Sequence, residues 1–325
     1  MSRSLLLRLV RGAVVVFGVV TLTFLLLRLA PGDPVRRLLG PAASIEQITA
    51  ARRDLGLDRP LLEQYLHWLG RAARGDFGTS IAHGRPATAL LGEAWPATAL
   101  LVLLSIVLSY AGGLALGALQ ANTRRPSLDA GLSALVVALN AMPGYWLGLA
   151  LVMLFTYQLH WLPAFGAVGL DADFLDRWSR VVDRLRHLTL PLATLTLIGL
   201  GGTARFARAT MRELRDAPFL VVARAKGLPE LRVVGRHQLR NALVPIVTLL
   251  GLSLPALFSG AVFVEAIFAW PGVGQVLVQA VQARDYPVVM AAATISAALV
   301  VAGNLLAEIL VTRVDPRVRE RRGES

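Results

Sequence analysis

The sequence contains no cysteine, and its 33 basic residues include a single lysine, Lys226. The lack of cysteine excludes disulfides, zinc–thiolate sites and thiol catalysis, and it leaves the redox compartment open. The five histidines are scattered with no pair spaced four residues apart, and no segment matches the G-x-x-x-x-G-K-[ST] phosphate loop. We therefore expect no metal site, no cofactor and no ATP hydrolysis in this chain.

Charged residues are scarce over long stretches of the chain. Hydrophobic residues make up 55% of the sequence and the mean hydropathy is +0.59, which is too apolar for an ordinary soluble domain. Six apolar runs are each long enough, at about 1.5 Å of rise per residue, to cross a hydrocarbon core of about 30 Å. The runs cover about residues 9–30, 96–120, 130–158, 188–209, 242–266 and 288–311. The sequence thus predicts an all-α, polytopic membrane protein with six transmembrane helices.

The net charge of +12 is concentrated in alternate loops. Residues 1–12, residues 205–241 and the C-terminal tail are basic, whereas 159–187 is balanced and 267–287 holds one arginine and one aspartate. This is the positive-inside pattern, and it predicts that both termini are cytoplasmic. The same distribution favours a membrane protein over a nucleic-acid-binding one.

Residues 31–94, between the first two runs, are polar and predict a small periplasmic lobe of short helices. Ser44 and Gln47 fit a capping box, and Asp58-Arg-Pro60 is suited to opening a second helix. The first run is near 20 residues long and no small-x-small cleavage site follows it. We therefore interpret it as a retained span and not as a signal peptide.

A basic segment, residues 216–241, joins the fourth and fifth runs and predicts a short helix-turn-helix. Asp216 is suited to the N-cap of its first helix, and Pro218 to the first turn. Residues 219–223 give that helix an apolar face, and Gly227 is suited to its C-terminal cap. A helix of about ten residues is marginal alone in water, so we expect it to need a partner groove.

Seven stretches stand out along the chain: Leu29-Ala-Pro-Gly-Asp-Pro34, Leu55-Gly-Leu-Asp-Arg-Pro60, Gly75-Asp-Phe-Gly-Thr-Ser80, Ala223-Arg-Ala-Lys-Gly-Leu228 with the following Asn241-Ala-Leu-Val-Pro245, Phe268-Ala-Trp-Pro-Gly-Val-Gly274, Arg284-Asp-Tyr-Pro287 and Asp315-Pro-Arg317. Together and in this order they resemble the permeases of binding-protein-dependent ABC importers. More narrowly, they resemble the peptide, opine and nickel subfamily, of the dipeptide/oligopeptide permease B type. The resemblance covers essentially the whole chain. One departure is that Val221, Val222 and Ala223 stand where the family has Glu-Ala-Ala.

The resemblance implies a type I ABC importer permease fold in the bacterial cytoplasmic (inner) membrane. This chain and a second permease subunit, a paralogue by the subfamily pattern, would form the translocation path. Two cytoplasmic ATPase subunits, using ATP and Mg, would drive transport, and a periplasmic or lipid-anchored binding protein would deliver the substrate. The partners implied are these proteins and membrane lipid, with no nucleic acid.

The resemblance also implies a domain plan and a docking element. Residues 1–30 would form the first span, 31–94 the outer lobe, 95–312 the transmembrane core and 313–325 a cytoplasmic tail. The coupling helix that docks on the ATPase would lie at about 216–228, with Phe219, Leu220 and Ala223 seated in the ATPase groove. Its residues are Asp216, Pro218, Phe219, Leu220, Ala223, Arg224, Ala225, Lys226 and Gly227.

Glycine and proline predict interruptions of the second run at Gly112-Gly113 and of the third at Met142-Pro143-Gly144. A proline at bilayer depth favours a bundle interior or a cavity wall. The candidates for lining the path are Asn140, Met142, Tyr145, Ser253, Ser259 and Glu265. Each of the first five is more typical of helix packing than of a path lining. Glu265 and Glu308 lie near the ends of runs, where we expect solvated interface positions.

The substrate predicted first is a di- or oligopeptide, and a nickel chelate, an opine or glutathione are the alternatives. Two functions of other classes, a membrane sensor signalling through the basic segment and an intramembrane enzyme, are weaker. The enzyme would need facing catalytic groups at depth, and no aspartate lies inside a predicted span.

Overall fold

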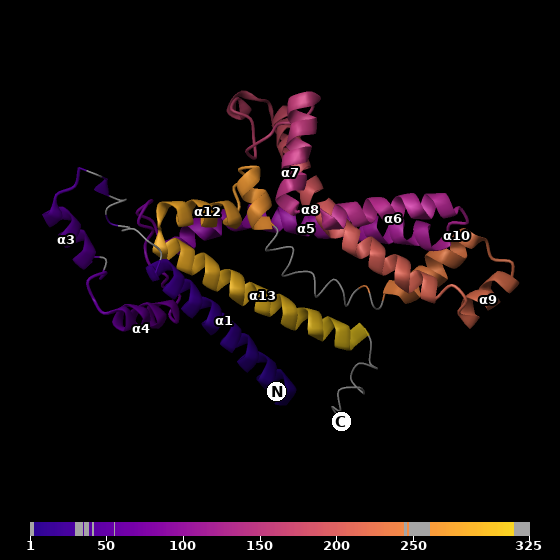
Figure 1. The fold of residues 1–325 in the computed structure, drawn as a ribbon, viewed down its shortest axis with the longest axis horizontal. Helices are drawn as coiled ribbons and strands as arrows, with labels where there is room; N and C mark the ends of the chain where they lie inside the picture. Colours follow the sequence, from indigo (N-terminus) through magenta and orange to yellow (C-terminus); the bar gives the residue numbers. More distant parts are fainter. Residues whose placement is uncertain are drawn as a thin grey trace. The chain divides into compact units, whose positions relative to one another are not determined.

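The computed structural model describes residues 3–29, 35, 39, 40, 42–54, 56–243, 246 and 261–314. Every named element in these residues is helical, which confirms the predicted all-α class. The long helices are α1 (Arg3–Leu29), α5 (Ala87–Asn122), α8 (Arg177–Glu213) and α13 (Tyr286–Val314) (Figure 1). The shorter ones are α3 (Ile45–Asp54), α4 (Leu61–Ala72), α6 (Pro126–Ala141), α7 (Gly144–Val152), α9 (Pro218–Ala225), α10 (Glu230–Arg232) and α12 (Val273–Ala283). Two π-helices, η1 (Met153–Gln158) and η3 (Val233–Gln238), and a 3-10 turn, η2 (Ala172–Phe174), complete the set.

Four helices of the described chain are long and apolar enough to cross a membrane: α1, α5, α8 and α13. The pair formed by α6 and α7–η1 passes the same test together but is bent by 105°, so it counts as one broken span. The bend lies at Pro143, where the sequence predicted an interruption, because proline cannot continue the hydrogen-bond ladder of α6. Most of the predicted fifth run, 242–266, lies outside the described residues, so the count of six spans stays a prediction.

The predicted interruption at Gly112-Gly113 is wrong, because α5 continues through both residues as a regular helix. The glycines serve close packing of α5 on α8 instead. A Cβ added at Gly113 would lie 2.6 Å from the Thr203 side chain, and one at Gly117 would lie 2.8 Å from the carbonyl oxygen of Ala204. Glycines four residues apart allow helix backbones to approach closely in a membrane, where apolar burial alone gives little drive for association.

We predict that Gly117→Ala destabilises the protein by roughly 1–3 kcal/mol, because the added methyl meets backbone atoms of α8 that cannot turn aside. The matched control is Gly92→Ala on the same helix, where an added Cβ meets no atom within 4 Å. The control should be neutral or slightly stabilising, since alanine is the better helix former. Thermal unfolding in detergent measures both, and equal melting temperatures would contradict the close-packing account.

The contacts divide the chain into two compact units, residues 1–98 with 271–301 and residues 99–270 with 302–325. In the first unit α1 and the adjoining part of α13 run antiparallel side by side (Figure 1). Gly12 lies against Val301 at one end of this pair, and Phe24 packs with Met290 towards the other.

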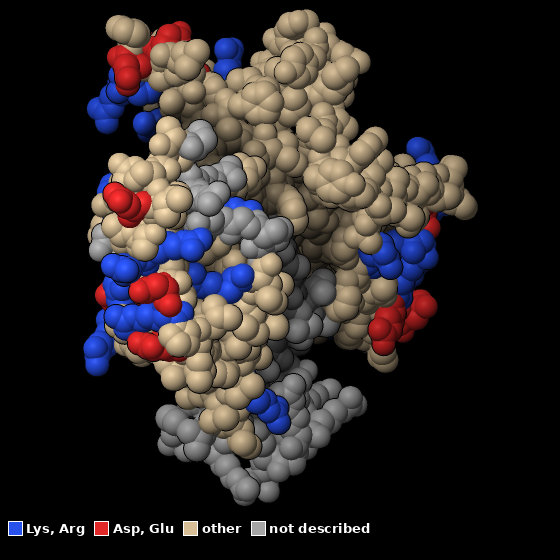
Figure 2. Space-filling model, turned by 60° about the vertical axis from the view of Figure 1, so that its left-hand side comes forward, with Lys and Arg blue, Asp and Glu red and all other residues tan. Residues whose placement is uncertain are grey.

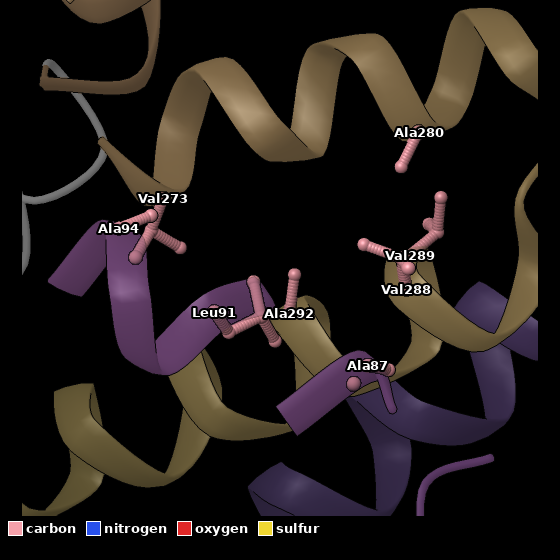
Figure 3. Packing of buried hydrophobic residues seen from close by; sticks show 9 residues of the cluster. Ala87, Leu91, Ala94, Val273, Ala280, Val288, Val289 and Ala292 are labelled. Atoms are coloured by element: carbon pink, nitrogen blue, oxygen red, sulfur yellow. The ribbon is translucent and has the colours of Figure 1, made fainter. Parts of the chain in front are cut away.

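The first unit has a core of mostly small and β-branched side chains from α5, α12 and α13, which point towards one another (Figure 3). The core residues are Ala87, Leu91, Ala94, Val273, Ala280, Val288, Val289, Ala291 and Ala292.

The lobe contains both predicted helices, α3 and α4. The capping box is confirmed: the Ser44 N–H donates to Gln47 Oε1 at 2.9 Å, and the Gln47 N–H donates to Ser44 Oγ at 3.2 Å. Tyr65 joins α4 to α1: its hydroxyl lies 2.7 Å from Thr21 Oγ1, and its ring centroid lies 5.1 Å from that of Phe24 with the two rings tilted by 57°. Tyr65 and Trp68 thus join α4 to the first span, while Leu61, Leu62 and Leu66 of the same helix are exposed.

Candidate functional site

The basic segment contains the short helix that the sequence predicted, now α9 (Pro218–Ala225), with Pro218 in its first turn. Asp216 is not its N-cap, which is a correction: Ala217 holds that position and no side chain caps the helix. Pro218 lacks an N–H, so one of the donors that a cap would satisfy does not exist. The helix ends at Ala225, and Gly227 follows with φ of +74°, a left-handed conformation that suits glycine at a helix end.

The apolar face of α9 is divided between the inside and the outside of the chain. Leu220 and Ala223 were predicted to sit in a partner groove, but they are 0% and 5% exposed and pack on Val233 and Leu228 of the same segment. An eight-residue helix gains too little from its own hydrogen bonds, so it buries one face within the chain. The side chains left outside are Phe219, Val221 and Val222, of which Val222 is 52% exposed.

The second half of the basic segment, α10 and η3, fastens α9 to the end of α8. Arg224 forms an ion pair with Glu230, with Nη2 3.0 Å from Oε1, and also donates to the carbonyl oxygen of Arg215 at 3.1 Å. The hydrogen bond from Arg224 holds the pKa of Glu230 below its usual range, so the pair is fully charged at neutral pH. Gln238 is buried and donates to the carbonyl oxygen of Met211 at 2.7 Å.

An ion-pair cluster joins α6 and α8 near the basic segment. Asp129, in the first turn of α6, accepts from Arg208 Nε at 2.9 Å and Nη2 at 2.7 Å, and from Arg212 Nη2 at 2.8 Å. The bidentate Arg208 contact fixes both the distance and the orientation of the two helices. The sequence analysis did not predict this pair, because nothing in the sequence shows that Asp129 and Arg208 are neighbours.

The structure brings together only some of the residues that were predicted to line the translocation path. Asn140, Met142 and Tyr145 flank the bend between α6 and α7, with Asn140 and Tyr145 exposed and Met142 half-buried. Ser253 and Ser259 lie outside the described residues, as does the side chain of Glu308. The solvated interface position predicted for Glu265 is wrong: its side chain is fully buried. The segment that carries it packs against α7, where the Phe268 ring lies against Gly148.

Two of the stretches singled out in the sequence meet in the first unit, which sequence reasoning had not anticipated. Asp285 is 1% exposed and accepts from Ser80 Oγ at 2.5 Å and from the N–H groups of Ile81 and Ala82 at 3.1 and 3.2 Å. The carboxylate thus fixes the turn that follows Gly75-Asp-Phe-Gly-Thr-Ser80. The partners lie more than 200 residues apart, and the only signal was that both stretches match one family.

We predict that Asp285→Ala destabilises the first unit by roughly 1–3 kcal/mol, because it leaves the buried Ser80 hydroxyl and the part-buried N–H of Ala82 without their acceptor. Asp58 is an exposed aspartate of the lobe, and Asp58→Ala is the matched control. Proteolysis of the 75–86 turn and thermal unfolding in detergent report the effect. If the two variants are cleaved and melt alike, the carboxylate does not hold the turn.

The described part of the chain holds no group of three or more His, Asp or Glu side chains that could bind a metal ion. His187 is buried within α8, where its Nδ1 lies 2.9 Å from the carbonyl oxygen of Asp183 and 3.3 Å from the Asp183 carboxylate. This histidine is a satisfied structural group.

Long apolar helices, one broken span and a basic helical extension fastened to α8 define a multi-pass helical membrane protein. The family model for binding-protein-dependent transport system inner membrane components matches residues 113–320, and the model for the N-terminal part of such components matches residues 1–108. The chain belongs to this family, so it is a membrane subunit of a transport system and not an enzyme.

The relatives are similar over nearly their full length. The oligopeptide transport system permease protein AppB of Bacillus subtilis (strain 168) is 39% identical over 305 residues, covering 94% of this chain and 95% of the relative. The di/tripeptide transport system permease protein DppB of Pseudomonas aeruginosa (strain UCBPP-PA14) is 38% identical over 320 residues, with the same coverage. A solved structure of the MetNI methionine ABC transporter, in an inward-facing conformation, aligns with a TM-score of 0.53 at 18% identity, covering 70% of this chain and 97% of that one. This likeness supports the ABC importer permease fold alone.

Proposed function

We propose that this chain forms half of the translocation path of an ATP-driven importer of di- or oligopeptides. The observation that carries the proposal is its similarity, over 94% of its length, to permeases named for oligopeptide and di/tripeptide transport. A nickel chelate, an opine or glutathione are the alternative substrates within the same architecture. The second permease subunit would be a paralogue, and a periplasmic or lipid-anchored protein would deliver the substrate.

The basic segment would receive force from an ATPase partner. Phe219 and Val222 give α9 an outward apolar face that a shallow groove could cover, next to the charged end at Lys226. Because Leu220 is buried inside the chain and Gln238 is bonded to Met211, a displacement of α9 has to move the end of α8 with it. Two ATPase subunits that close on ATP and Mg would in this way rock the spans between inward- and outward-facing states.

The domain plan and orientation follow from charge and hydropathy. We propose that the lobe at 31–94 lies on the periplasmic side, near the binding protein, and that the basic segment and both termini are cytoplasmic. Residues 95–312 would form the transmembrane core and 313–325 the tail. The bend between α6 and α7 would form part of the wall of the path, because it exposes Asn140 and Tyr145 where the helix backbone is broken.

We predict that Val222→Glu abolishes co-purification of the ATPase subunits and substrate-stimulated ATP hydrolysis, because it puts a charge on the outward face of α9. The melting temperature of the permease should change little, since Val222 is 52% exposed and does not belong to the buried cluster of Leu220 and Val233. Leu220→Ala should instead lower the free energy of unfolding of the permease by roughly 2–5 kcal/mol, because it leaves a cavity in the cluster that Leu220 forms with Val233.

The control is Leu170→Glu, which places the same charge on a fully exposed leucine outside the basic segment. The complex in nanodiscs is supplied with binding protein loaded with a dipeptide, an oligopeptide or a nickel chelate. Peptide-dependent ATP hydrolysis that Leu170→Glu retains and Val222→Glu loses supports the proposal. Stimulation by the nickel chelate alone would reject the peptide substrate, and normal coupling in Val222→Glu would reject the docking face.

A further inference from the structure

A cavity of about 390 Å³ lies in the first unit between α1, the lobe and the start of α13. Figure 2 turns this side of the molecule forward and shows basic side chains gathered next to acidic ones on a mostly uncharged surface. Among the described residues, the cavity is lined by four arginines and one histidine and by no Asp or Glu. The basic lining residues are Arg28, Arg53, Arg59, Arg71 and His67.

Two of these arginines form ion pairs, and two form none with the residues that the structure describes. Arg59 pairs with Glu63 at 3.0 Å and Arg71 with Asp76 at 2.8 Å, at exposed positions on the rim of the cavity. Among the described residues, neither Arg28 nor Arg53 has a carboxylate within ion-pair distance. Arg28 is half-buried, and a half-buried arginine without an anion is electrostatically costly, so a bound anion would remove that cost.

Arg28 is held in place by aromatic rings. Its guanidinium carbon lies 5.3 Å from the ring centroid of Phe24 and 5.1 Å from that of Tyr286. Contacts with two rings restrict the planar fork, so little side-chain freedom is lost when it binds a ligand. Arginine forks match the oxygen geometry of a phosphate group through two parallel hydrogen bonds.

The cavity lies where two spans meet the polar part of the chain. The apolar run of α1 ends at Leu29, one residue after Arg28, and the apolar run of α13 begins at Tyr286. Both helix ends line the cavity, with Trp68 of α4 beside them. Aromatic and arginine side chains at the end of a span belong to the headgroup layer of a bilayer. This layer is on the side where the positive-inside pattern predicts no excess of arginine, so that pattern does not account for the four present.

We propose that this cavity binds a phosphate-bearing anion, and that the headgroup of an anionic phospholipid supplies it. The phosphate would lie between Arg28 on α1 and Arg53 on α3, with Arg59 and Arg71 at the rim. Leu27 and Met290 give the cavity an apolar side on which the glycerol and the first acyl carbons would lie. One bound lipid would thereby link the lobe to the two spans of its own unit. The site is independent of the transported substrate and of the ATPase partner.

The test uses the full-length chain, purified in detergent and reconstituted in nanodiscs of phosphatidylcholine containing a small fraction of phosphatidylglycerol. Native mass spectrometry measures lipid retained by the protein, and thermal unfolding measures stabilisation by added lipid. Arg28→Gln and Arg53→Gln should each lower phosphatidylglycerol retention about tenfold, equivalent to about 1.4 kcal/mol. Arg74→Gln, an exposed lobe arginine that does not line the cavity, is the matched control and should retain lipid like the parent.

Soluble probes separate the two sources of phosphate. One outcome is that inorganic phosphate or glycerol phosphate raises the melting temperature of the parent, but not of Arg28→Gln, and displaces the lipid. That result would support the anion site and show that its ligand is a soluble phosphate and not a lipid headgroup. If only phosphatidylglycerol binds in an Arg28-dependent manner, the headgroup assignment stands. Equal retention in the parent, Arg28→Gln and Arg53→Gln overturns the site. Arg53 is exposed on α3, so Arg53→Gln remains informative even if Arg28→Gln fails to fold.

Discussion

The close approach of α5 to α8 is the contact on which the second unit depends. In a bilayer the solvent is as apolar as the side chains, so helices are selected by how tightly their backbones fit. Gly113 and Gly117 allow α5 to lie directly on the Thr203–Ala207 stretch of α8, and a Cβ at either position would come within 2.6 Å of an α8 side chain. α8 in turn contacts α6 and α7 and continues to the basic segment, so an error in this one contact would displace every other helix of the unit.

Ion pairs and charged hydrogen bonds stabilise the arrangement of the helices further. Asp129 joins α6 to α8 through Arg208 and Arg212, and the Arg224–Glu230 pair closes the basic segment on itself. In the first unit, buried Asp285 does the same for the turn at Ser80. Each acid neutralises arginine or backbone donors at the end of an apolar element, where an unsatisfied polar group would be expensive. In the described part of the chain, Arg28 and Arg53 are the exception, and this is why their cavity is informative.

Most features that depend on neighbouring residues were predictable from the sequence, the N-cap at Asp216 excepted, and features that depend on distant residues were not. The capping box at Ser44, the bend at Pro143 and the left-handed Gly227 each follow from the local preference of one residue. The Gly112-Gly113 pair was misjudged because the same glycines that weaken a helix also allow it to pack closely, and only the position of α8 decides between these effects. The burial of Leu220 and Glu265 depends in the same way on segments that the chain folds back against them.

The positions of the π-helices indicate which parts of the second unit could adjust when its helices move. α8 is a continuous helix of 37 residues, about 55 Å long at ~1.5 Å per residue, and it carries the basic segment at one end. Pro191 removes one hydrogen bond of its ladder, but the helix continues through this residue. The backbone is irregular on either side of it: π-helix η1 follows α7 and π-helix η3 follows α10. π-Helical turns place one residue more than an α-helix in each hydrogen-bonded ring and often occur at functional positions. We therefore expect local adjustment at η1 and η3, with α8 and the α5 contact moving as a rigid body between them.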